Sequence, residues 1–165
     1  MSALRKAPDG MGDLKWGDST ERFTELWDPS PWKLTDEDKD GNRIGTRILD
    51  SIGHVRLTGP CEYFFYKDGY YNFTARFKGK SYFIDLSYAL SEKYGKPNEK
   101  PLFLMINPNA RVGTEYIWNL EDLVVIALEF NEQKDEGLLS YTYIPIQNEL
   151  MKERKKKADK LKDSL

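Results

Sequence analysis

Two aromatic-rich runs on either side of Asp68-Gly69 constrain the fold more than any other feature of the sequence. They stand in CEYFFYKDGYYNFTARF, residues 61–77. Asp-Gly is a preferred centre for a two-residue type I′ hairpin turn, because both central positions need a positive φ. The stretch therefore predicts two antiparallel strands, with Lys67 opposite Tyr70 and Phe64 opposite Phe73.

That register gives the predicted hairpin two different faces. Alternate side chains of a strand point to opposite sides of a sheet, so one face can pack on a core. The apolar face would consist of Phe64, Tyr66, Tyr71, Phe73 and Phe77. The opposite face would be amphipathic and would carry Tyr63, Phe65 and Tyr70.

The amphipathic face supplies a candidate binding surface. Tyr63, Phe65 and Tyr70 would be joined by Trp27 and Trp32 of WDPSPW. Tyrosine and tryptophan suit binding surfaces because they combine a large contact area with a polar group. A helix or loop that covered this face would instead make it a second core layer, and the sequence leaves both interpretations open.

Three other stretches have helical patterns. Asp18 has capping-box spacing and would begin a first helix, which the prolines of DPSP (residues 28–31) would end. SYFIDLSYALSEKYGKP, residues 81–97, predicts a second helix that ends at its Tyr-Gly. Pro145 suits the first turn of a lysine-rich helix that continues to the last residue.

The order of these elements indicates the fold class. Further strands are predicted at residues 101–106 and 114–118, and a second hairpin joins LVVIALEF to GLLSYTYI. We expect an α+β fold, with a mainly antiparallel sheet of about six to eight strands built from hairpins and two to three helices packed on it. A chain of 165 residues is about one domain. The expected division is a single α+β domain over residues 1–150 and a charged helical tail over residues 151–165.

Composition excludes several classes of protein. The chain is 39% hydrophobic with a mean hydropathy of −0.67, and no apolar run approaches the roughly 20 residues of a membrane span. The single cysteine, Cys61, excludes an internal disulfide framework and a cysteine-cluster zinc site. The net charge of −2 gives no reason to expect nucleic acid as a partner. The first residues contain no apolar signal region, so the expected location is the cytoplasm by default, or the periplasm if a signal was removed.

Several of these motifs together resemble a known group of proteins. Trp16-Gly17 before a helix, YFFYKDGYYNFTARF, LSYALSEKYGKP and LSYTYIPI are similar to segments of small bacterial α+β proteins of unknown function, many of them exported. The resemblance covers most of the chain and rests on structural motifs. It implies a bacterial protein and favours a periplasmic location, and it supplies no catalytic residues.

An acidic stretch, DEDKDGNRIG (residues 36–45), begins as a calcium loop does. Asp36, Asp38 and Asp40 occupy the first three ligand positions of an EF-hand loop, but Arg47 stands where the bidentate glutamate belongs. An EF-hand is therefore excluded, and a looser calcium site at these three aspartates is an alternative. The simpler interpretation is a hairpin turn centred on Asp40 and its following glycine, with Asp38 opposite Arg43.

The sequence has no recognisable catalytic pattern. The single histidine, His54, has no activated serine or cysteine signature to accompany it, and the phosphate-binding glycine loops are absent. We therefore expect a protein that is not an enzyme and has no cofactor, with Ca²⁺ as the one ion to consider. A carboxylate-dependent hydrolase without a recognisable motif is a further alternative.

The function predicted from the sequence is a non-enzymatic binding or assembly module. It would use a sheet face or an edge strand to contact a protein or peptide partner, and it could form a homo-oligomer. The tail, residues 151–165, carries seven Lys or Arg against three Asp or Glu, which leaves a net charge of −6 on the rest of the chain. A solvated helix explains this charge better than nucleic-acid binding does.

Overall fold

The computed structural model describes residues 6–27 and 32–165, and this part of the chain has the predicted α+β fold. Its helices are α1 (Thr20–Leu26), α2 (Lys80–Tyr94) and α3 (Ile144–Asp163). Its long strands are β4 (Asn42–Arg47), β7 (Cys61–Tyr66), β8 (Gly69–Lys78), β9 (Asn98–Leu104), β10 (Asn107–Leu120), β11 (Val124–Asn131) and β12 (Glu136–Tyr143). Its short strands are β1 (Gly10–Met11), β2 (Leu14–Lys15), β3 (Trp32–Leu34), β5 (Ser51–Ile52) and β6 (Val55–Arg56).

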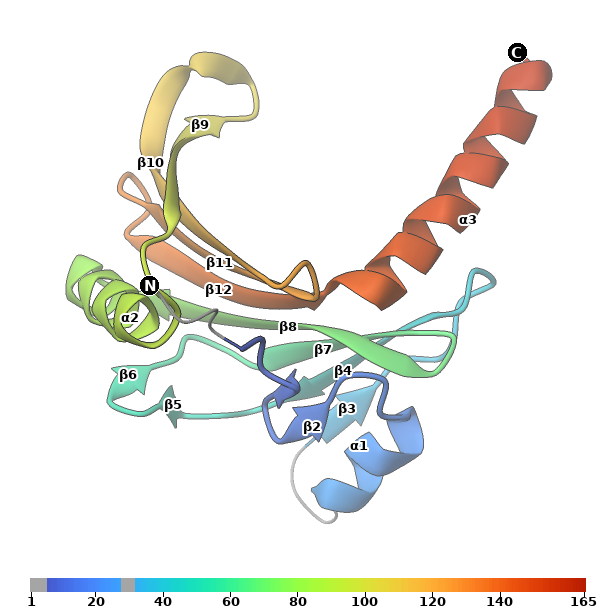
Figure 1. Ribbon diagram of the computed structural model, residues 1–165, viewed down its shortest axis with the longest axis horizontal. Coiled ribbons are helices and arrows are strands. Elements are labelled where there is room, and N and C mark those ends of the chain that lie inside the picture. The colour runs from blue at the N-terminus through green and yellow to red at the C-terminus, as the bar shows by residue number, and fades with distance from the viewer. Residues whose placement is uncertain (1–5, 28–31) are drawn as a thin grey trace.

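One antiparallel sheet of eight strands organises the described residues (Figure 1). Its strand order is β3-β4-β7-β8-β12-β11-β10-β9. Strands β7 and β8, and strands β9 to β12, are neighbours along the chain and form hairpins. The pairing of β12 with β8 joins these two groups into one sheet. The prediction of an antiparallel sheet built from hairpins is therefore confirmed.

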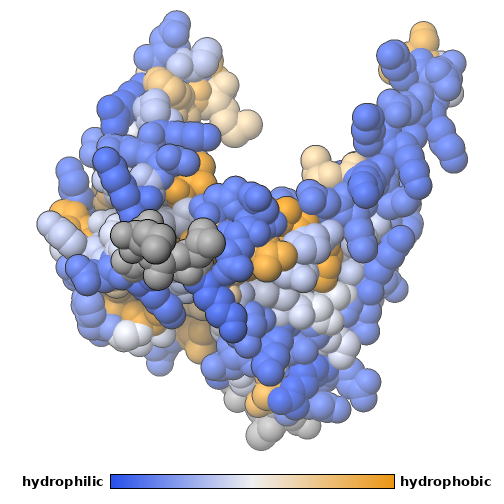
Figure 2. Space-filling model, viewed as in Figure 1, coloured by the Kyte–Doolittle hydropathy of each residue, from blue (hydrophilic) through white to orange (hydrophobic). Residues whose placement is uncertain are grey.

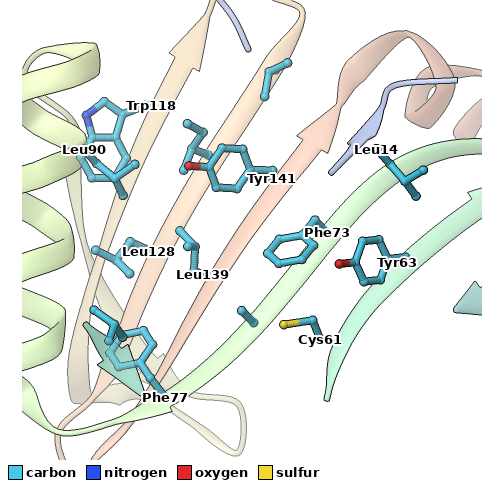
Figure 3. Close-up of a cluster of buried hydrophobic side chains, with 14 of the residues drawn as sticks. Leu14, Cys61, Tyr63, Phe73, Phe77, Leu90, Trp118, Leu128, Leu139 and Tyr141 are labelled. Atoms are coloured by element: carbon cyan, nitrogen blue, oxygen red, sulfur yellow. The ribbon is translucent and has the colours of Figure 1, made fainter. Parts of the chain in front are cut away.

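The core lies on the face of the sheet that α1 and α2 cover. Phe83 of α2 stacks on Tyr116 of β10 at 5.4 Å and on Phe130 of β11 at 5.3 Å. Phe23 of α1 packs edge-to-face against Tyr63 of β7 at 5.2 Å. Figure 3 shows buried side chains from both regions on this one face, beside α2. The two helices and the short β1–β2 hairpin thus close a single, largely aromatic core.

The opposite face, which we call the open face, is polar and half-buried. One row across it consists of Asn98, Ile117, Ala127, Ser140, Thr74 and Glu62, each opposite the next on neighbouring strands. At one end of this face α3 packs through its first turns, where Ile146 approaches Gly69 and Leu150 is buried. After Leu150, α3 passes the turn before β4, where Lys157 pairs with Asp40, and its last turns point into solvent (Figure 1).

Hydrogen bonds and backbone conformations of nearby residues determine where the helices begin and end. The predicted N-cap of α1 is wrong by one residue. Ser19, not Asp18, is the N-cap of α1: its hydroxyl accepts from the backbone N–H of Arg22. The Asp18 carboxylate instead accepts from the N–H of Lys15 in the preceding turn. Gly95 ends α2 with a φ of 91°, a conformation that favours glycine. The predicted stop at DPSP lies outside the described residues.

The turn between β7 and β8 corrects the predicted register. Its central residues are Lys67 and Asp68, with φ of 46° and 63°, so Tyr66 pairs with Gly69. The Asp68 carboxylate holds the turn in this position by accepting from the backbone N–H (3.0 Å) and the hydroxyl (2.6 Å) of Thr20. A bulge follows, after which Tyr63 lies opposite Phe73. The predicted pairing of Phe64 with Phe73 is therefore wrong by one residue. This shift in register moves the side chains of β7 to the faces opposite those predicted.

The turn before β4 also differs from the prediction. The backbone N–H of Gly41 bonds to the carbonyl of Asp38, and the N–H of Asp38 bonds to the carbonyl of Asn42. The turn therefore centres on Lys39 and Asp40, and Gly41 follows it with a φ of 86°. The predicted pairing of Asp38 with Arg43 is wrong by one residue for this reason.

Helix α3 crosses the boundary that the sequence predicts between the domain and its charged tail. Leu150 is the last buried residue of the chain, and α3 continues without a break from the sheet into the charged segment. The boundary predicted at residue 150 thus coincides with a change in exposure inside one helix.

Among the described residues, no helix has the length and apolar character needed to span a membrane.

Candidate functional site

The aromatic residues predicted as a binding surface lie in the core. Tyr63 and Tyr70 are 0% exposed, and Phe65 is 1% exposed. The bulge and the shifted turn place them on the face that α1 and the β1–β2 hairpin cover, where the hydroxyl of Tyr70 donates to the carbonyl of Met11 at 2.9 Å. The interpretation of these three as an exposed surface is wrong. The alternative, in which a helix or loop covers them, is correct, although they belong to the single core beside Phe73 rather than to a second core layer.

The two tryptophans join the same cluster. Trp27 is 6% exposed and lies edge-to-face on Phe23 at 4.8 Å, while the guanidinium of Arg47 covers its ring at 4.4 Å. Trp32 is partly buried against Phe23 at 6.0 Å. The structure therefore brings four of the five predicted residues together around Phe23, and Tyr70 joins them through Tyr63 and Phe65, as packing rather than as a contact surface.

Two of the three aspartates in the acidic loop bind other groups of the same chain. The Asp38 carboxylate accepts from the backbone N–H groups of Asn42 (2.9 Å) and Asp40 (2.8 Å), and these bonds lower its pKa. The Asp40 carboxylate pairs with Lys157 of α3 and raises the pKa of that lysine. In the described part of the chain, no three His, Cys, Asp or Glu side chains gather in a group that could hold a metal ion. Calcium binding by Asp36, Asp38 and Asp40 stays a prediction without structural support.

The two residues with nucleophilic or general-base chemistry lie apart. Cys61 is fully buried, and burial raises the pKa of its thiol to about 11, which disfavours the reactive thiolate. His54, in the β5–β6 hairpin, forms a 2.7 Å pair with Asp85 of α2 at the surface. This pair ties the small hairpin to the helix, and Cys61 takes no part in it.

The largest apolar exposure in the described residues is at the end of the β9–β10 hairpin. Phe103 is 44% exposed, Met105 101% and Ile106 93%, and we call these three residues the apolar tip. Beyond the pair Gly113–Asn131, β10 has no register partner in β11, and residues 103–111 extend past the sheet as a two-stranded arm. Figure 2 shows this arm and α3 standing apart with an open hollow between them.

The strand that leads into the arm is an edge of the sheet. Within residues 6–27 and 32–165, β9 pairs with β10 alone, so its outer side presents backbone groups without a strand partner in that part of the chain. Its first half carries Glu99, Lys100 and Pro101, which are residue types that discourage pairing with another chain. Residues 101–110, by contrast, contain no charged residue. Protection against association is therefore present at the base of the hairpin and missing toward its tip.

A pair of carboxyl groups lies on the open face at the base of the arm. Glu115 of β10 is directly opposite Glu129 of β11 in the register of the two strands. Burial and the neighbouring Glu115 raise the pKa of Glu129, and Arg76 opposes this shift. Glu129 and Arg76 line a cavity of about 400 Å³. This pair brings two carboxyls together, as the hydrolase alternative requires, and that alternative stays a prediction.

The sequence contained a signal for the tip but only a weak one for the carboxyl pair. Met105 and Ile106 directly precede Asn107-Pro108-Asn109, so an apolar pair beside a turn sequence could have indicated exposed apolar side chains. Glu115 and Glu129 are 14 positions apart and become neighbours only through the β10–β11 register. Finding them required that register, which neither strand specifies alone.

Comparison with known proteins adds no identity to this geometry. No family model matches the chain, and neither the curated proteins nor the solved structures contain a match. The resemblance to small exported bacterial proteins therefore stays an expectation.

Proposed function

We propose that this chain is a non-enzymatic binding module that contacts a protein partner through the apolar tip and the outer edge of β9. The observation that carries the proposal is the exposure of Phe103, Met105 and Ile106 at the end of an arm that extends beyond the sheet. The surface differs from the one predicted, which was the amphipathic face of the β7–β8 hairpin. It corresponds to the edge strand predicted from the sequence as the other means of contact.

The energetics favour a binding role over chance exposure. Single exposed apolar residues are common and need no explanation. Three large ones gathered at one projecting end, within ten uncharged residues (101–110), form the kind of surface that marks contact sites. Burial of one such side chain contributes roughly 1.5–3 kcal/mol, so two or three of them suffice as anchors.

The edge of β9 favours a polypeptide as the partner. Its outer backbone groups can pair with an extended segment of another chain, which is a common mode of peptide recognition. A lipid surface offers no matching ladder of donors and acceptors. The charges at Glu99 and Lys100 would restrict such pairing to the half of β9 nearest the tip.

Site-specific photocrosslinking tests the proposal. A benzophenone amino acid replaces Ile106 in one full-length variant and Tyr88 in a matched control, because Tyr88 lies on α2 and is 70% exposed. In cells that express the chain naturally, we expect the Ile106 position to form one discrete crosslinked product, either with a second protein or with another copy. The Tyr88 position should not form it.

The crosslinked partner is then purified and its affinity measured against the wild-type chain and the M105D/I106D variant. We expect the variant to bind at least about tenfold more weakly, since about 1.4 kcal/mol corresponds to a factor of ten. Equal affinity, or equal crosslinking from Tyr88, would overturn the proposal. So would cosedimentation of the wild-type chain, but not of the variant, with phosphatidylglycerol vesicles in the absence of any protein partner.

A further inference from the structure

We propose that Glu115 and Glu129 are a proton-sharing pair that fastens the β9–β10 arm to the sheet when the pair holds one proton and loosens it when both groups are ionised. The inference concerns the chain by itself and does not depend on what the arm binds.

The placement of the two glutamates is the first argument. Glu115 and Glu129 are direct cross-strand partners, so their side chains lie next to each other on the same face of the sheet. A carboxylate offers only acceptors, so two carboxyl groups can bond to each other only if one of them is protonated. The pair therefore attracts when it holds one proton and repels when both groups are ionised.

The position of the pair is the second argument. The last contact between β10 and β11 is the pair Gly113–Asn131, and Glu115–Glu129 is only two residues from it. Beyond Gly113, β10 continues into the arm with register irregularities against β9. Repulsion at Glu115 would act where the arm leaves the sheet, and like charges directly opposite each other destabilise a strand pair.

The surrounding charges do not remove this repulsion. Lys100 of β9 is opposite Glu115 and exposed, and among the described residues no ion pair joins them. Arg76 of β8 lies beyond Leu138 in the same row and is bound at 3.4 Å to Glu62 of β7. The other charged groups lining the cavity beside Glu129 are Lys78, Lys134 and Glu136. These cations moderate the field, while the direct register partner of Glu129 on β10 is another carboxyl.

The direction of the pH effect follows from linkage. The pKa of Glu129 in the folded chain is raised above its ordinary value of 4.5, mainly by burial and next by Glu115. The folded pair therefore holds its proton more tightly than the unfolded chain does. Its contribution to the attachment is fully present below the unfolded-state pKa and is lost as the pH rises through the folded-state value. The arm should be held more firmly in mild acid than at neutral pH.

Carbon-detected NMR titration of the wild-type glutamate carboxyls tests the shared proton without any substitution. We expect the Glu129 carboxyl to show an upper titration step above the ordinary glutamate range, because burial and the neighbouring Glu115 raise its pKa. A Glu129 carboxyl that titrates at the ordinary value would overturn the proposal.

Hydrogen exchange tests the effect on the arm. Protection factors, corrected for the intrinsic pH dependence of exchange, are measured for amides of residues 111–117 on the two sides of the upper titration step. In the wild-type chain we expect protection to fall by about two- to fivefold on ionisation, in proportion to the cost of opposed like charges. The isosteric Glu129→Gln variant should keep the same protection at both pH values.

Glu136→Gln is the matched control, because Glu136 lines the same cavity and lies opposite Lys78 and Asn131 rather than another carboxyl. It should retain the wild-type fall in protection. A wild-type chain with unchanged protection across the titration, or an E129Q variant that still shows the fall, would overturn the role assigned to the pair.

Discussion

The β7–β8 and β9–β10 hairpins belong to one sheet, yet they use their large apolar residues in opposite ways. In the first, Tyr63, Phe65 and Phe73 are at most 1% exposed and are covered by α1 and the β1–β2 hairpin. In the second, Met105 and Ile106 are almost fully exposed. The difference arises from what lies against each hairpin, since both are rich in residues that favour strands. A hairpin without a covering element retains its apolar side chains for contacts outside the chain.

Replacement of Phe73 with Ala should have the largest effect on stability. It measures how much the packing of the β7–β8 hairpin contributes to the free energy of unfolding. The side chain is 0% exposed and contacts Tyr63 at 5.3 Å. We expect the free energy of unfolding to fall by about 3–5 kcal/mol, because the change removes buried apolar area and leaves a cavity. Urea denaturation followed by tryptophan fluorescence measures it. A loss below about 1 kcal/mol would show that this hairpin is no better packed than the arm.

Replacement of Asp68 with Ala tests what fixes the turn of the covered hairpin. The change removes two hydrogen bonds to Thr20 and places alanine at a φ of 63°. We expect a loss of about 0.5–2 kcal/mol in unfolding free energy, as for the loss of a helix cap. Asp68→Asn keeps an acceptor and tolerates the positive φ, so it should lose clearly less. Equal losses in the two variants would contradict the role of the carboxylate in positioning the turn.

Replacement of Ile106 with Ser should change stability by no more than about 0.5 kcal/mol, as is usual for surface positions. The side chain is 93% exposed, so the folded chain by itself gains little from it. The same urea titration used for Phe73→Ala provides a direct comparison. A loss above about 1 kcal/mol would mean that the tip packs within the chain, and the contrast between the hairpins would disappear.

Calcium should have the smallest effect, with no change in the melting midpoint between millimolar calcium and chelator. Asp38 and Asp40 are engaged by backbone N–H groups and by Lys157, so the loop between β3 and β4 has little left to offer an ion. Ligand binding to the native state must raise its stability. A rise in the midpoint that Asp36→Asn and Asp38→Asn each remove would restore the calcium alternative.

The fold was predictable because its elements are set by local patterns. Alternating apolar residues and turn sequences identified the β11–β12 hairpin, and the Tyr94-Gly95 boundary identified the end of α2. Register was less predictable, since the side chain of Thr20, 48 residues away, selects which residues form the turn after Tyr66. The site was least predictable: the exposure of Phe103 depends on the absence of a covering element among the described residues, and no residue of β9 encodes that.

The C-terminal helix has a consequence for how the molecule approaches any partner. Residues 151–165 carry a net charge of +4 against −6 on the rest of the chain, and α3 holds much of that charge away from the sheet. A helix of 20 residues is about 30 Å long, which exceeds the Debye length of roughly 10 Å at 0.1 M salt. The protein is therefore a strong electric dipole with a fixed axis. In the field of a charged partner it will rotate before it touches, and the salt concentration will set how early that rotation begins.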